Sequence, residues 1–524
     1  MRLTKKVVSV RSIIAGFSAG IVACGSIGLA SATPPDNTRV IVTFKPGSAA
    51  SVHGAVASAR GQIKHEIFGE DAFAIEIPSN ALNGLARNPN VESIEPDEYR
   101  FTFAGTTPST GNPYQLGQLV PYGIKMVQAD QLPSGDALAA NRKVCIIDSG
   151  YDLQHEDLNG NTVTGEYDSG TGWWYTDENN HGTHVAGTIA AVNNSLGVVG
   201  VNPNRNLKLH IVKVFNAAGW AYSSSLITAA NKCSAAGANI ISMSLGGSRK
   251  VALEDKAFNT LANNGILSIA AAGNSGTTAL SYPAGYASVV SVGALDENKQ
   301  WATFSQYNRK VELSAPGVNV LSTVPMGTGT ASSLTVGSSA YDPGAMDGSP
   351  QATATAPLAN FGIGDVINTA VSGKICLIQR GTVDFATKVN NCKNSGGLGA
   401  VVYNNVAGGF TGTLGTTITT IPSVTASNTE GAAMLQQLGQ TATVAVQPSN
   451  YAFFDGTSMA TPHVSAVAAL VWSYYTNCTA AQMRSTLGKS AEDLGGVGRD
   501  TKFGFGLVRA RAAYDRIAAL GCGN

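Results

Sequence analysis

Charged side chains are scarce in this chain, and neither sign prevails. Only 13% of the 524 residues are Asp, Glu, Lys or Arg, and 34 basic residues balance 34 acidic ones. A protein that binds nucleic acid or an anionic membrane surface usually carries an excess of positive charge, so this balance argues against both partners. The hydrophobic content of 44% is instead typical of a globular protein with a large core.

Long apolar runs are also missing, except at the N-terminus. Four basic residues precede a stretch of apolar and small residues from Ser12 to Leu29, and Ala30-Ser31-Ala32 then offers a small-residue cleavage site. This order is typical of a secretory signal peptide. We therefore expect residues 1–32 to be removed and the mature protein to be secreted, without a transmembrane segment. Lipoprotein anchoring through Cys24 is the alternative.

Cysteine is sparse as well, with seven residues in the chain. Removal of Cys24 with the signal peptide leaves six, and an even number in an exported chain points to disulfides. Six cysteines can pair in many ways, and the sequence alone does not select one. Closeness along the chain favours Cys376–Cys392 and Cys478–Cys522, which leaves Cys145–Cys233. Buried free thiols are the alternative.

The alternation of apolar strands with helical segments indicates how the chain is divided. Residues 38–100 contain two strand patterns and one helical segment, which predicts a small α+β unit. From residue 142 onward, continuous apolar strands alternate with helices, which predicts an α/β fold with a parallel sheet covered on both faces. Residues 326–450 are rich in Thr, Gly, Ala and Ser with short β-like runs, as expected for a domain inserted in a loop.

One hydroxyl group lies in a setting that suits a nucleophile. Ser458 is flanked by small residues in Gly456-Thr457-Ser458-Met459-Ala460, directly ahead of an apolar helical run. The N-terminus of a helix offers free N–H groups and the positive end of the helix dipole, and small neighbours let a substrate backbone approach. Because serine alone is a weak nucleophile, this interpretation requires a base and an orienting acid elsewhere.

Two other segments offer an acid and a base. The apolar run Val144–Ile147 ends at Asp148, and the carboxyl ends of strands are where sites form in open α/β sheets. His181-Gly182-Thr183-His184 opens a helix, and we expect His184 to be the base and His181 to be structural. A metal pair is the alternative for these two histidines, but no third ligand is evident nearby. His463 is expected to be a packing residue.

The order Asp148, His184, Ser458 and the motifs around these residues resemble those of the subtilisin-like serine proteases, over roughly residues 117–325 and 451–515. The resemblance implies that Ser458 attacks the scissile carbonyl, that His184 transfers the proton and that Asp148 orients the imidazole. It also implies that Asn274 forms the oxyanion hole together with the backbone N–H of Ser458.

The same resemblance implies a substrate cleft. Residues 242–247 resemble the edge segment that pairs with an extended substrate through backbone hydrogen bonds. No acidic residue occurs in the segments expected to wall the primary pocket, so we expect an apolar or aromatic residue at P1, the position before the cleaved bond. The residues expected to bind substrate are Ser244, Leu245, Gly246, Ala272, Gly273 and Ser281.

A calcium site is implied as well, because residues 191–198 resemble the high-affinity calcium loop of the family. Oxygen ligands of this number suit Ca²⁺ rather than zinc, and a turn without metal is the alternative. The implied ligands are the side chains of Gln118, Asp157 and Asn194 and the backbone carbonyls of Val192, Leu196 and Val198.

Two accessory segments resemble parts found in this family. Residues 38–100 resemble an inhibitory propeptide, and self-cleavage is expected between about Tyr99 and Leu116. The segment around Cys376 resembles a protease-associated (PA) domain. The expected organisation is a signal peptide (1–32), a propeptide (33–110), a catalytic domain in two parts (111–325 and 451–524) and a mostly β PA insert (326–450).

Together these features predict a secreted, calcium-stabilised serine endopeptidase of broad specificity, made as a self-processing zymogen. It would be a monomer that cleaves proteins and peptides and is inhibited by its own propeptide. The alternative is a catalytically silent subtilase fold that binds proteins through its PA insert. A processing protease for paired basic sites would need acidic residues in the pocket walls, and none is evident there.

Overall fold

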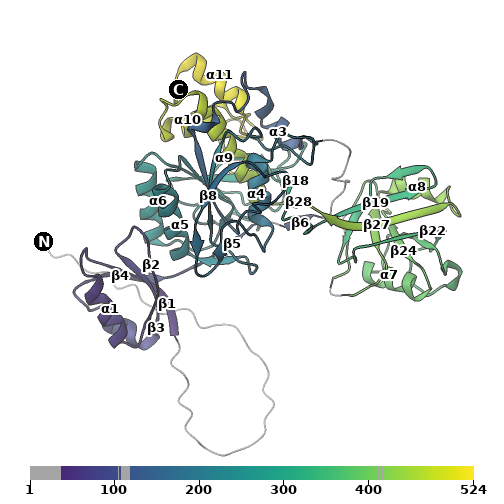
Figure 1. Cartoon of the computed structure of the whole chain (residues 1–524), viewed down its shortest axis with the longest axis horizontal. Helices are drawn as coiled ribbons and strands as arrows, with labels where there is room; N and C mark the ends of the chain where they lie inside the picture. The colour runs from purple at the N-terminus through teal and green to yellow at the C-terminus, as the bar shows by residue number, and fades with distance from the viewer. Residues whose placement is uncertain (1–36, 104, 108–117, 411, 416) are drawn as a thin grey trace, which may run out of the picture.

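The computed structural model describes residues 37–103, 105–107, 118–410, 412–415 and 417–524. The predicted signal peptide and Cys24 lie outside the described residues, as does much of the segment in which self-cleavage is expected. Figure 1 shows a small N-terminal unit, a large central unit and an insert that projects from the central unit. Of the helices in the described ranges, none combines the length and the hydropathy that a membrane span needs.

The central unit is built on a seven-stranded parallel sheet, as the sequence predicts. Within β7, Val144 and Ile146 belong to one hydrophobic cluster, whereas Cys145 and Ile147 belong to another. Because both faces of such a strand are buried, its apolar residues follow one another without alternation. The strand order is β17 (Val311–Pro316), β16 (Val289–Leu295), β15 (Leu267–Ala271), β13 (Ile240–Met243), β7 (Lys143–Asp148), β11 (Lys208–Lys213) and β8 (Thr162–Gly165).

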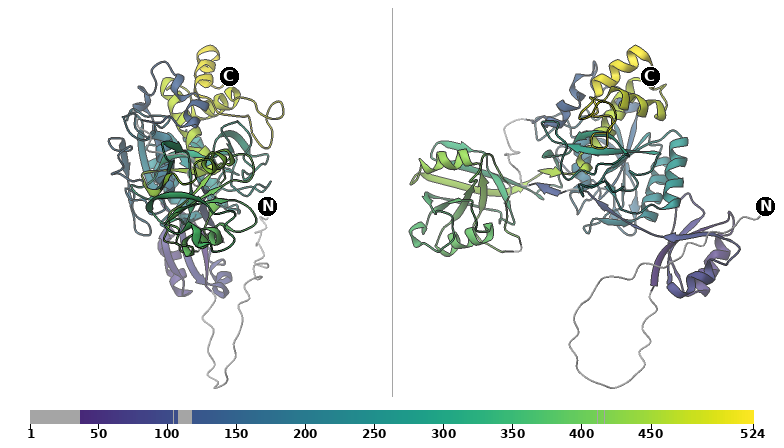
Figure 2. Two further views of the ribbon diagram at one scale, coloured as in Figure 1. Left: turned by 90° about the vertical axis from the view of Figure 1, so that its right-hand side faces the viewer. Right: turned by 180° about the vertical axis from the view of Figure 1, so that it is seen from behind.

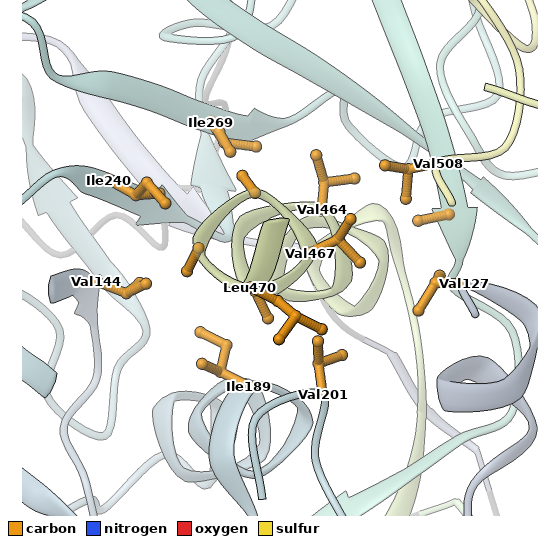
Figure 3. Packing of buried hydrophobic residues seen from close by; sticks show 14 of the residues in the cluster. Val127, Val144, Ile189, Val201, Ile240, Ile269, Val464, Val467, Leu470 and Val508 are labelled. Atoms are coloured by element: carbon orange, nitrogen blue, oxygen red, sulfur yellow. The ribbon is translucent and has the colours of Figure 1, made fainter. Parts of the chain in front are cut away.

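Helices cover both faces of this sheet. All residues of the central helix α9 are buried except Tyr474, and small or apolar side chains surround its whole circumference, as expected for a helix inside a core. Figure 3 shows Val464 and Leu470 of α9 among Val144, Ile240 and other core residues. The covering helices are α4 (His181–Ala190) and α9 (Thr457–Tyr474) on one face, and α5 (Ser223–Ala235) and α6 (Ala252–Asn263) on the other.

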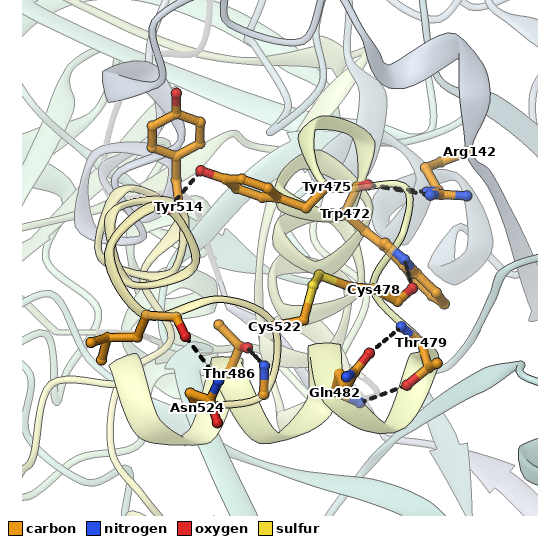
Figure 4. Close-up of a disulfide and its surroundings, with 12 residues drawn as sticks. Arg142, Trp472, Tyr475, Cys478, Thr479, Gln482, Thr486, Tyr514, Cys522 and Asn524 are labelled. Atoms are coloured by element: carbon orange, nitrogen blue, oxygen red, sulfur yellow. Dashed lines mark hydrogen bonds between the residues drawn. A yellow bond between two sulfur atoms is a disulfide. The ribbon is translucent and has the colours of Figure 1, made fainter.

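The two disulfides favoured by closeness along the chain and the third pair left over are all confirmed. Cys376–Cys392, Cys478–Cys522 and Cys145–Cys233 are all bonded, with Cα–Cα distances of 6.2, 5.5 and 5.7 Å. Figure 4 shows the bond of Cys478 to Cys522, which ties the start of α10 to the end of the chain. Further elements of the central unit are α3 (Tyr122–Met126), β9 (Tyr167–Asp168), β10 (Gly172–Trp173), α10 (Ala480–Ser490) and α11 (Ala510–Leu520).

The N-terminal unit is a four-stranded antiparallel sheet with two helices, as expected for a small α+β unit. It packs on α5 and α6 of the central unit, where Ile41 and Ile67 share a buried cluster with Ile227 and Leu253 (Figure 2). Its elements are β1 (Asn37–Phe44), α1 (Ala49–Ser58), β2 (Gln62–Glu66), β3 (Ala72–Pro78), α2 (Leu82–Leu85) and β4 (Val91–Pro96), and the sheet order is β2-β3-β1-β4.

The insert leaves the central unit after β18 (Val320–Thr323) and returns in β28 (Tyr451–Asp455), which pair with each other in antiparallel fashion. It contains a nine-stranded mixed sheet and helices α7 (Phe385–Asn394) and α8 (Asn428–Leu435). Since β28 leads directly into α9, the insert is attached beside Ser458. Its strands are β19 (Gly329–Val336), β20 (Ser339–Tyr341), β21 (Gly344–Asp347), β22 (Ala352–Asn360), β23 (Ile375–Gln379), β24 (Gly399–Tyr403), β25 (Gly412–Thr413), β26 (Ser423–Ala426) and β27 (Thr441–Ser449).

Candidate active site

A carboxylate and an imidazole meet at the carboxyl end of β7. Nδ1 of His181 lies 2.7 Å from Oδ1 of Asp148, and both side chains are buried. The backbone N–H of Ser149 donates to the same oxygen at 2.7 Å. Nε2 of His181 has no hydrogen-bond partner among the described residues. An imidazole held through Nδ1 in this way keeps Nε2 available to accept a proton.

The prediction that His184 is the base is wrong. Its Nε2 lies 2.9 Å from the carbonyl oxygen of Val320 and 3.1 Å from that of Ala452. The ring stacks on Phe454 at 4.3 Å, and burial lowers the pKa of His184 to about 3. His184 is therefore a neutral packing residue, and the structural role predicted for His181 belongs to it instead. His463 is buried as expected, with its Nδ1 2.8 Å from the carbonyl oxygen of Met459.

Asp177 fixes the start of the helix that carries His181, although the sequence analysis gave it no role. Its Oδ2 accepts hydrogen bonds from the backbone N–H and the hydroxyl of Thr183, at 2.8 and 2.7 Å. Its Oδ1 accepts from the hydroxyl of Ser149 at 2.8 Å, and that hydroxyl accepts from the N–H of Gly182. Asn180 stands at the N-cap position without a side-chain hydrogen bond to the helix, so Asp177 takes over the role that a capping residue usually has.

A close approach of two chain segments requires glycine next to His181. A Cβ atom at Gly182 would overlap the carbonyl oxygen of Gly150, which follows the strand that carries Asp148. With no Cβ atom, the start of α4 can lie directly against the end of β7. The distance between His181 and Asp148 therefore depends on this glycine.

Ser458 is the second residue of α9, and its side chain is held by Ser244. Oγ of Ser458 donates to the carbonyl oxygen of Ser244 at 2.8 Å, and the hydroxyl of Ser244 donates to the carbonyl oxygen of Ser458 at 2.7 Å. Ser458 and His181 are not hydrogen-bonded to each other in this conformation. Catalytic hydrogen bonds are often incomplete until the reacting complex forms, so this arrangement is compatible with a nucleophile and its base.

The side-chain amide of Asn274 is oriented by Thr457. Its Oδ1 accepts hydrogen bonds from the backbone N–H and the hydroxyl of Thr457, at 2.9 and 2.8 Å. Because the oxygen is held in this way, Nδ2 faces the opposite direction and donates to the carbonyl oxygen of Phe103 at 2.8 Å. The N–H of Gly273 donates to the same Thr457 hydroxyl at 3.1 Å, which ties this loop to α9. Asn274 thus presents a fixed donor to a carbonyl group beside Ser458.

That carbonyl belongs to a segment of the chain that crosses the site in extended form. β5 (Tyr99–Thr102) pairs in antiparallel fashion with β14 (Leu245–Gly246) and β12 (Trp220–Tyr222). The N–H of Phe103 donates to Oγ of Ser458 at 3.2 Å. Beyond it, β6 (Gly105–Thr107) pairs with β28. The carbonyl group of Phe103 is therefore presented at Ser458 as the scissile carbonyl of a substrate would be.

The ring of Phe103 occupies the position predicted for the primary pocket. A Cβ atom at Gly246 would lie 2.6 Å from Cε2 of Phe103 and would also collide with the hydroxyl of Ser281. Gly246 and Ser281 therefore border the ring of Phe103. Leu245 pairs with Thr102 in the strand ladder. Ser244 holds the nucleophile, as described above. The backbone N–H groups of Ala272 and Gly273 bond to Val292 and Thr457 and not to Phe103. The positions predicted for these two residues in the pocket wall therefore stay predictions.

Two carboxylates of the N-terminal unit cap helices of the central unit. Glu95 accepts hydrogen bonds from the first N–H groups of α6, those of Ala252 at 2.8 Å and Leu253 at 2.9 Å. Asp97 accepts from the N–H of Ser224 at 3.0 Å and from its hydroxyl at 2.7 Å, at the start of α5. Negative charge at a helix N-terminus is stabilising, so both acids hold the N-terminal unit against the helices next to the cleft.

Most of the predicted calcium ligands gather around one point. Nε2 of Gln118 lies 2.6 Å from the carbonyl oxygen of Val192, 3.2 Å from that of Val198 and 3.4 Å from Oδ1 of Asn194. The carboxylate of Asp157 accepts from the amide of Asn194 at 3.0 Å. The oxygen atoms of Val192, Asn194 and Val198 thus converge on the amide nitrogen of Gln118. Oxygen atoms arranged in this way are the kind of ligand that Ca²⁺ prefers, so the loop fits the ion if the Gln118 amide turns its oxygen toward it.

The same loop has few carboxylates. The described residues contain no group of three or more His, Cys, Asp or Glu side chains that could hold a metal. An ion at this loop would therefore depend on carbonyl and amide oxygens together with Asp157. Leu196, the remaining predicted ligand, donates its backbone N–H to Oδ1 of Asn194 at 2.7 Å and so helps to shape the loop.

Sequence comparisons show which known proteins the chain resembles. The sequence model of the Subtilase family matches residues 139–358 and 402–506, and that of the PA domain matches residues 337–434. Subtilisin DY from Bacillus licheniformis is 44% identical over 222 residues, which are 41% of this chain and 78% of that protein. An alkaline protease from Alkalihalobacillus alcalophilus is 37% identical over 271 residues, which are 51% of this chain and 66% of that protein. The chain thus spans just under two thirds of that relative's length.

A solved structure extends the similarity to most of the chain. The psychrophilic subtilisin-like protease Apa1 from the Antarctic psychrotroph Pseudoalteromonas sp. AS-11 is 44% identical, with a TM-score of 0.63. The match covers 78% of this chain and 100% of that one. Both the sequence and the arrangement of the fold are therefore shared with this protease.

Proposed function

Because the chain belongs to the subtilase family of serine endopeptidases, we propose that it hydrolyses peptide bonds of proteins through Asp148, His181 and Ser458. One observation carries this proposal. The N–H of Phe103 donates to Oγ of Ser458 at 3.2 Å and its carbonyl oxygen accepts from Asn274 at 2.8 Å, so a carbonyl group already lies where the reaction requires one.

Each group has a role that follows from its contacts. Rotation of the Ser458 side chain away from Ser244 directs Oγ toward the carbonyl carbon, and the free Nε2 of His181 takes its proton. Asp148 holds the imidazole through Nδ1 and stabilises the cation. Nδ2 of Asn274 and the N–H of Ser458 bind the developing oxyanion. His181 then gives the proton to the leaving amine, and water releases the acyl group by the same steps in reverse.

We also propose that the N-terminal unit is an inhibitory propeptide and that the first bond cleaved is Phe103–Ala104. The caps formed by Glu95 and Asp97 and the strand ladder of β5 support this proposal, since they hold the segment in the cleft as a product-like inhibitor. Secretion belongs to the same proposal and is supported by the signal-like sequence of residues 1–32. The bond falls within the predicted interval from about Tyr99 to Leu116.

A catalytically silent binding protein would be expected to lack at least one part of this machinery. Asp148, His181, Ser458 and Asn274 are all present, and the first two are in direct contact. The silent fold is therefore the weaker interpretation.

Expression of the wild type beside Ser458→Ala tests the proposed activity. We expect the wild type to digest casein and the variant to do so at least about 10⁴-fold more slowly, because the variant lacks the nucleophile. The contrary result is equal casein digestion by both proteins, or none by either when both are folded.

A bound calcium ion is part of the proposal as well. Gln118, Asp157 and Asn194, with the carbonyls of Val192 and Val198, would hold it, and the ion would supply charge neutralisation and cross-link the loop to the start of the catalytic domain. The support is the convergence of these oxygen atoms described above.

Chelation should therefore lower the melting temperature of the wild type. An ion present at about 1,000 times its Kd stabilises the folded state by about 4 kcal/mol, which amounts to several degrees. In Asp157→Asn the difference between calcium and chelator should shrink to near zero, while Asp515→Asn, at an exposed position, should keep it. Differential scanning calorimetry with and without Ca²⁺ measures both. Equal melting of the wild type in calcium and in chelator would contradict the site.

A further inference from the structure

The segment that lies in the cleft carries a charged residue in a fully buried position. With Phe103 at P1, Arg100 stands at P4, and it has 0% relative exposure. Its partner Ala221 in the strand ladder fixes this position next to β12. A buried guanidinium group is stable only where its charge and its donors are matched.

The matching group is the carboxylate of Glu254. Nε of Arg100 lies 3.2 Å from Oε1 of Glu254, and Nη2 donates to Oε2. Nη1 donates to the carbonyl oxygen of Tyr99 at 2.9 Å, and Nη2 also donates to that of Arg249 at 3.2 Å. Two parallel contacts to one carboxylate use the planar fork of arginine, which lysine and neutral side chains cannot reproduce.

Glu254 is held in place by residues of the catalytic domain. It lies in the first turn of α6 with 0% relative exposure. Oη of Tyr286 lies 2.9 Å from Oε2 of Glu254 and accepts a hydrogen bond from the N–H of Val251 at 3.1 Å. These contacts do not involve the propeptide. The carboxylate is therefore positioned by residues that remain after the propeptide has left.

Glycine opens the way into this pocket. A Cβ atom at Gly247 would lie 3.0 Å from Nη1 of Arg100 and would overlap the carbonyl oxygen of Tyr99. The pocket is thus bordered by Gly247, Glu254 and Tyr286, and an extended substrate strand places its P4 side chain there. A neutral P4 residue would leave the buried carboxylate without its charged partner, which is unfavourable.

We propose that Glu254 makes the mature enzyme select arginine at P4, so that good substrates combine Arg at P4 with an aromatic residue at P1. This inference rests on the proposed peptidase activity and on the placement of Phe103 at P1. The sequence Arg100-Phe101-Thr102-Phe103 is then an example of a preferred substrate. Glu254 supplies an acid to the P4 pocket and not to the primary pocket, whose walls remain without one; for this reason the sequence analysis, which covered only the primary pocket, did not consider it.

Peptide p-nitroanilides test this selectivity on the mature wild type without any variant. The series is Xaa-Phe-Thr-Phe-p-nitroanilide with Arg, Lys, Leu or Ala as Xaa, each with a blocked N-terminus. We expect kcat/KM for the Arg peptide to exceed that for the Leu and Ala peptides by about 10–100-fold, since charge-assisted hydrogen bonds are lost. Equal values for Arg, Leu and Ala would overturn the inference while the activity stands, whereas cleavage of none of them would count against the proposed function itself.

A pair of variants assigns the selectivity to one carboxylate. In Glu254→Gln the ratio of kcat/KM between the Arg and Ala peptides should fall by about 10-fold or more, because the amide is neutral. Asp255→Asn makes the same change at the next residue, where the side chain pairs with Lys250, and should keep the wild-type ratio. If Glu254→Gln does not mature, the peptide series on the wild type still tests whether the enzyme prefers arginine at P4. An unchanged ratio in mature Glu254→Gln would overturn the assignment.

Discussion

Replacement of His181 by alanine is expected to abolish self-cleavage, lowering the rate by about 10⁴–10⁶-fold. His181 is the histidine in contact with Asp148, at 2.7 Å, and its Nε2 has no partner among the described residues. Without it, nothing in the site takes the proton of Ser458. Intact-mass measurement of the purified proenzyme over time gives the rate directly, even where no mature enzyme forms.

His184→Gln is the matched comparison, because it changes the other histidine of the same helix. We expect this variant to cleave itself but to be less stable by about 1–3 kcal/mol, since it loses the stack on Phe454 and part of the contacts to Val320 and Ala452. Urea denaturation measures the stability, and self-cleavage is compared at low temperature. The assignment would be reversed if His184→Gln were inert while folded and His181→Ala still cleaved itself.

Replacement of Asn274 by alanine is expected to lower kcat by about 10²–10³-fold with a much smaller change in KM. The amide of Asn274 reaches the carbonyl oxygen of Phe103 at 2.8 Å, and this contact strengthens as negative charge develops on that oxygen. Steady-state kinetics on the mature variant separates the two constants. A rise in KM with an unchanged kcat would show instead that Asn274 only binds the ground state.

Thr457 provides a second variant on the same contact. Thr457→Val removes the hydroxyl that donates to Oδ1 of Asn274 at 2.8 Å, so the amide loses part of its orientation. We expect a smaller loss than in Asn274→Ala, of about 10-fold, and a largely restored rate in Thr457→Ser, which keeps the hydroxyl. The effect of Thr457→Val should nearly vanish when Asn274 is already alanine, because the two changes act on one interaction.

Much of the fold could be predicted from the sequence. Continuous apolar strands such as Val144–Ile147 lie inside a parallel sheet, and periodicity alone indicates that both faces of such strands are covered. Closeness along the chain favoured two of the disulfides and left the third by elimination, and the positions of Asp148, Ser458 and Asn274 followed from motifs that resemble a family. These features are local in sequence or carried by distinctive residue patterns.

The choice between two histidines could not be made in the same way. His181 and His184 share one motif and one helix, and only the direction in which each side chain leaves α4 separates them. That direction depends on where the helix begins, which is set by Asn180 and Asp177 and by the close contact at Gly182. A boundary error of a few residues is enough to exchange the two roles.

The pocket for Arg100 was missed for a different reason. It is assembled from residues far apart in sequence, since Glu254 lies on α6 and Tyr286 precedes β16. Their common property is only that they meet in space around a segment of the N-terminal unit. A pattern confined to one stretch of sequence carries no signal for such a site.

The contacts of Phe103 with Ser458 and Asn274 imply that the proenzyme first cleaves its own Phe103–Ala104 bond. The most direct measurement is intact mass with N-terminal sequencing of both fragments, taken at the earliest time at which the wild-type proenzyme is cleaved, beside Ser458→Ala. We expect a propeptide that ends at Phe103, a mature chain that begins at Ala104, and an uncleaved Ser458→Ala protein. First cleavage at another bond, or the same cleavage in Ser458→Ala, would contradict it.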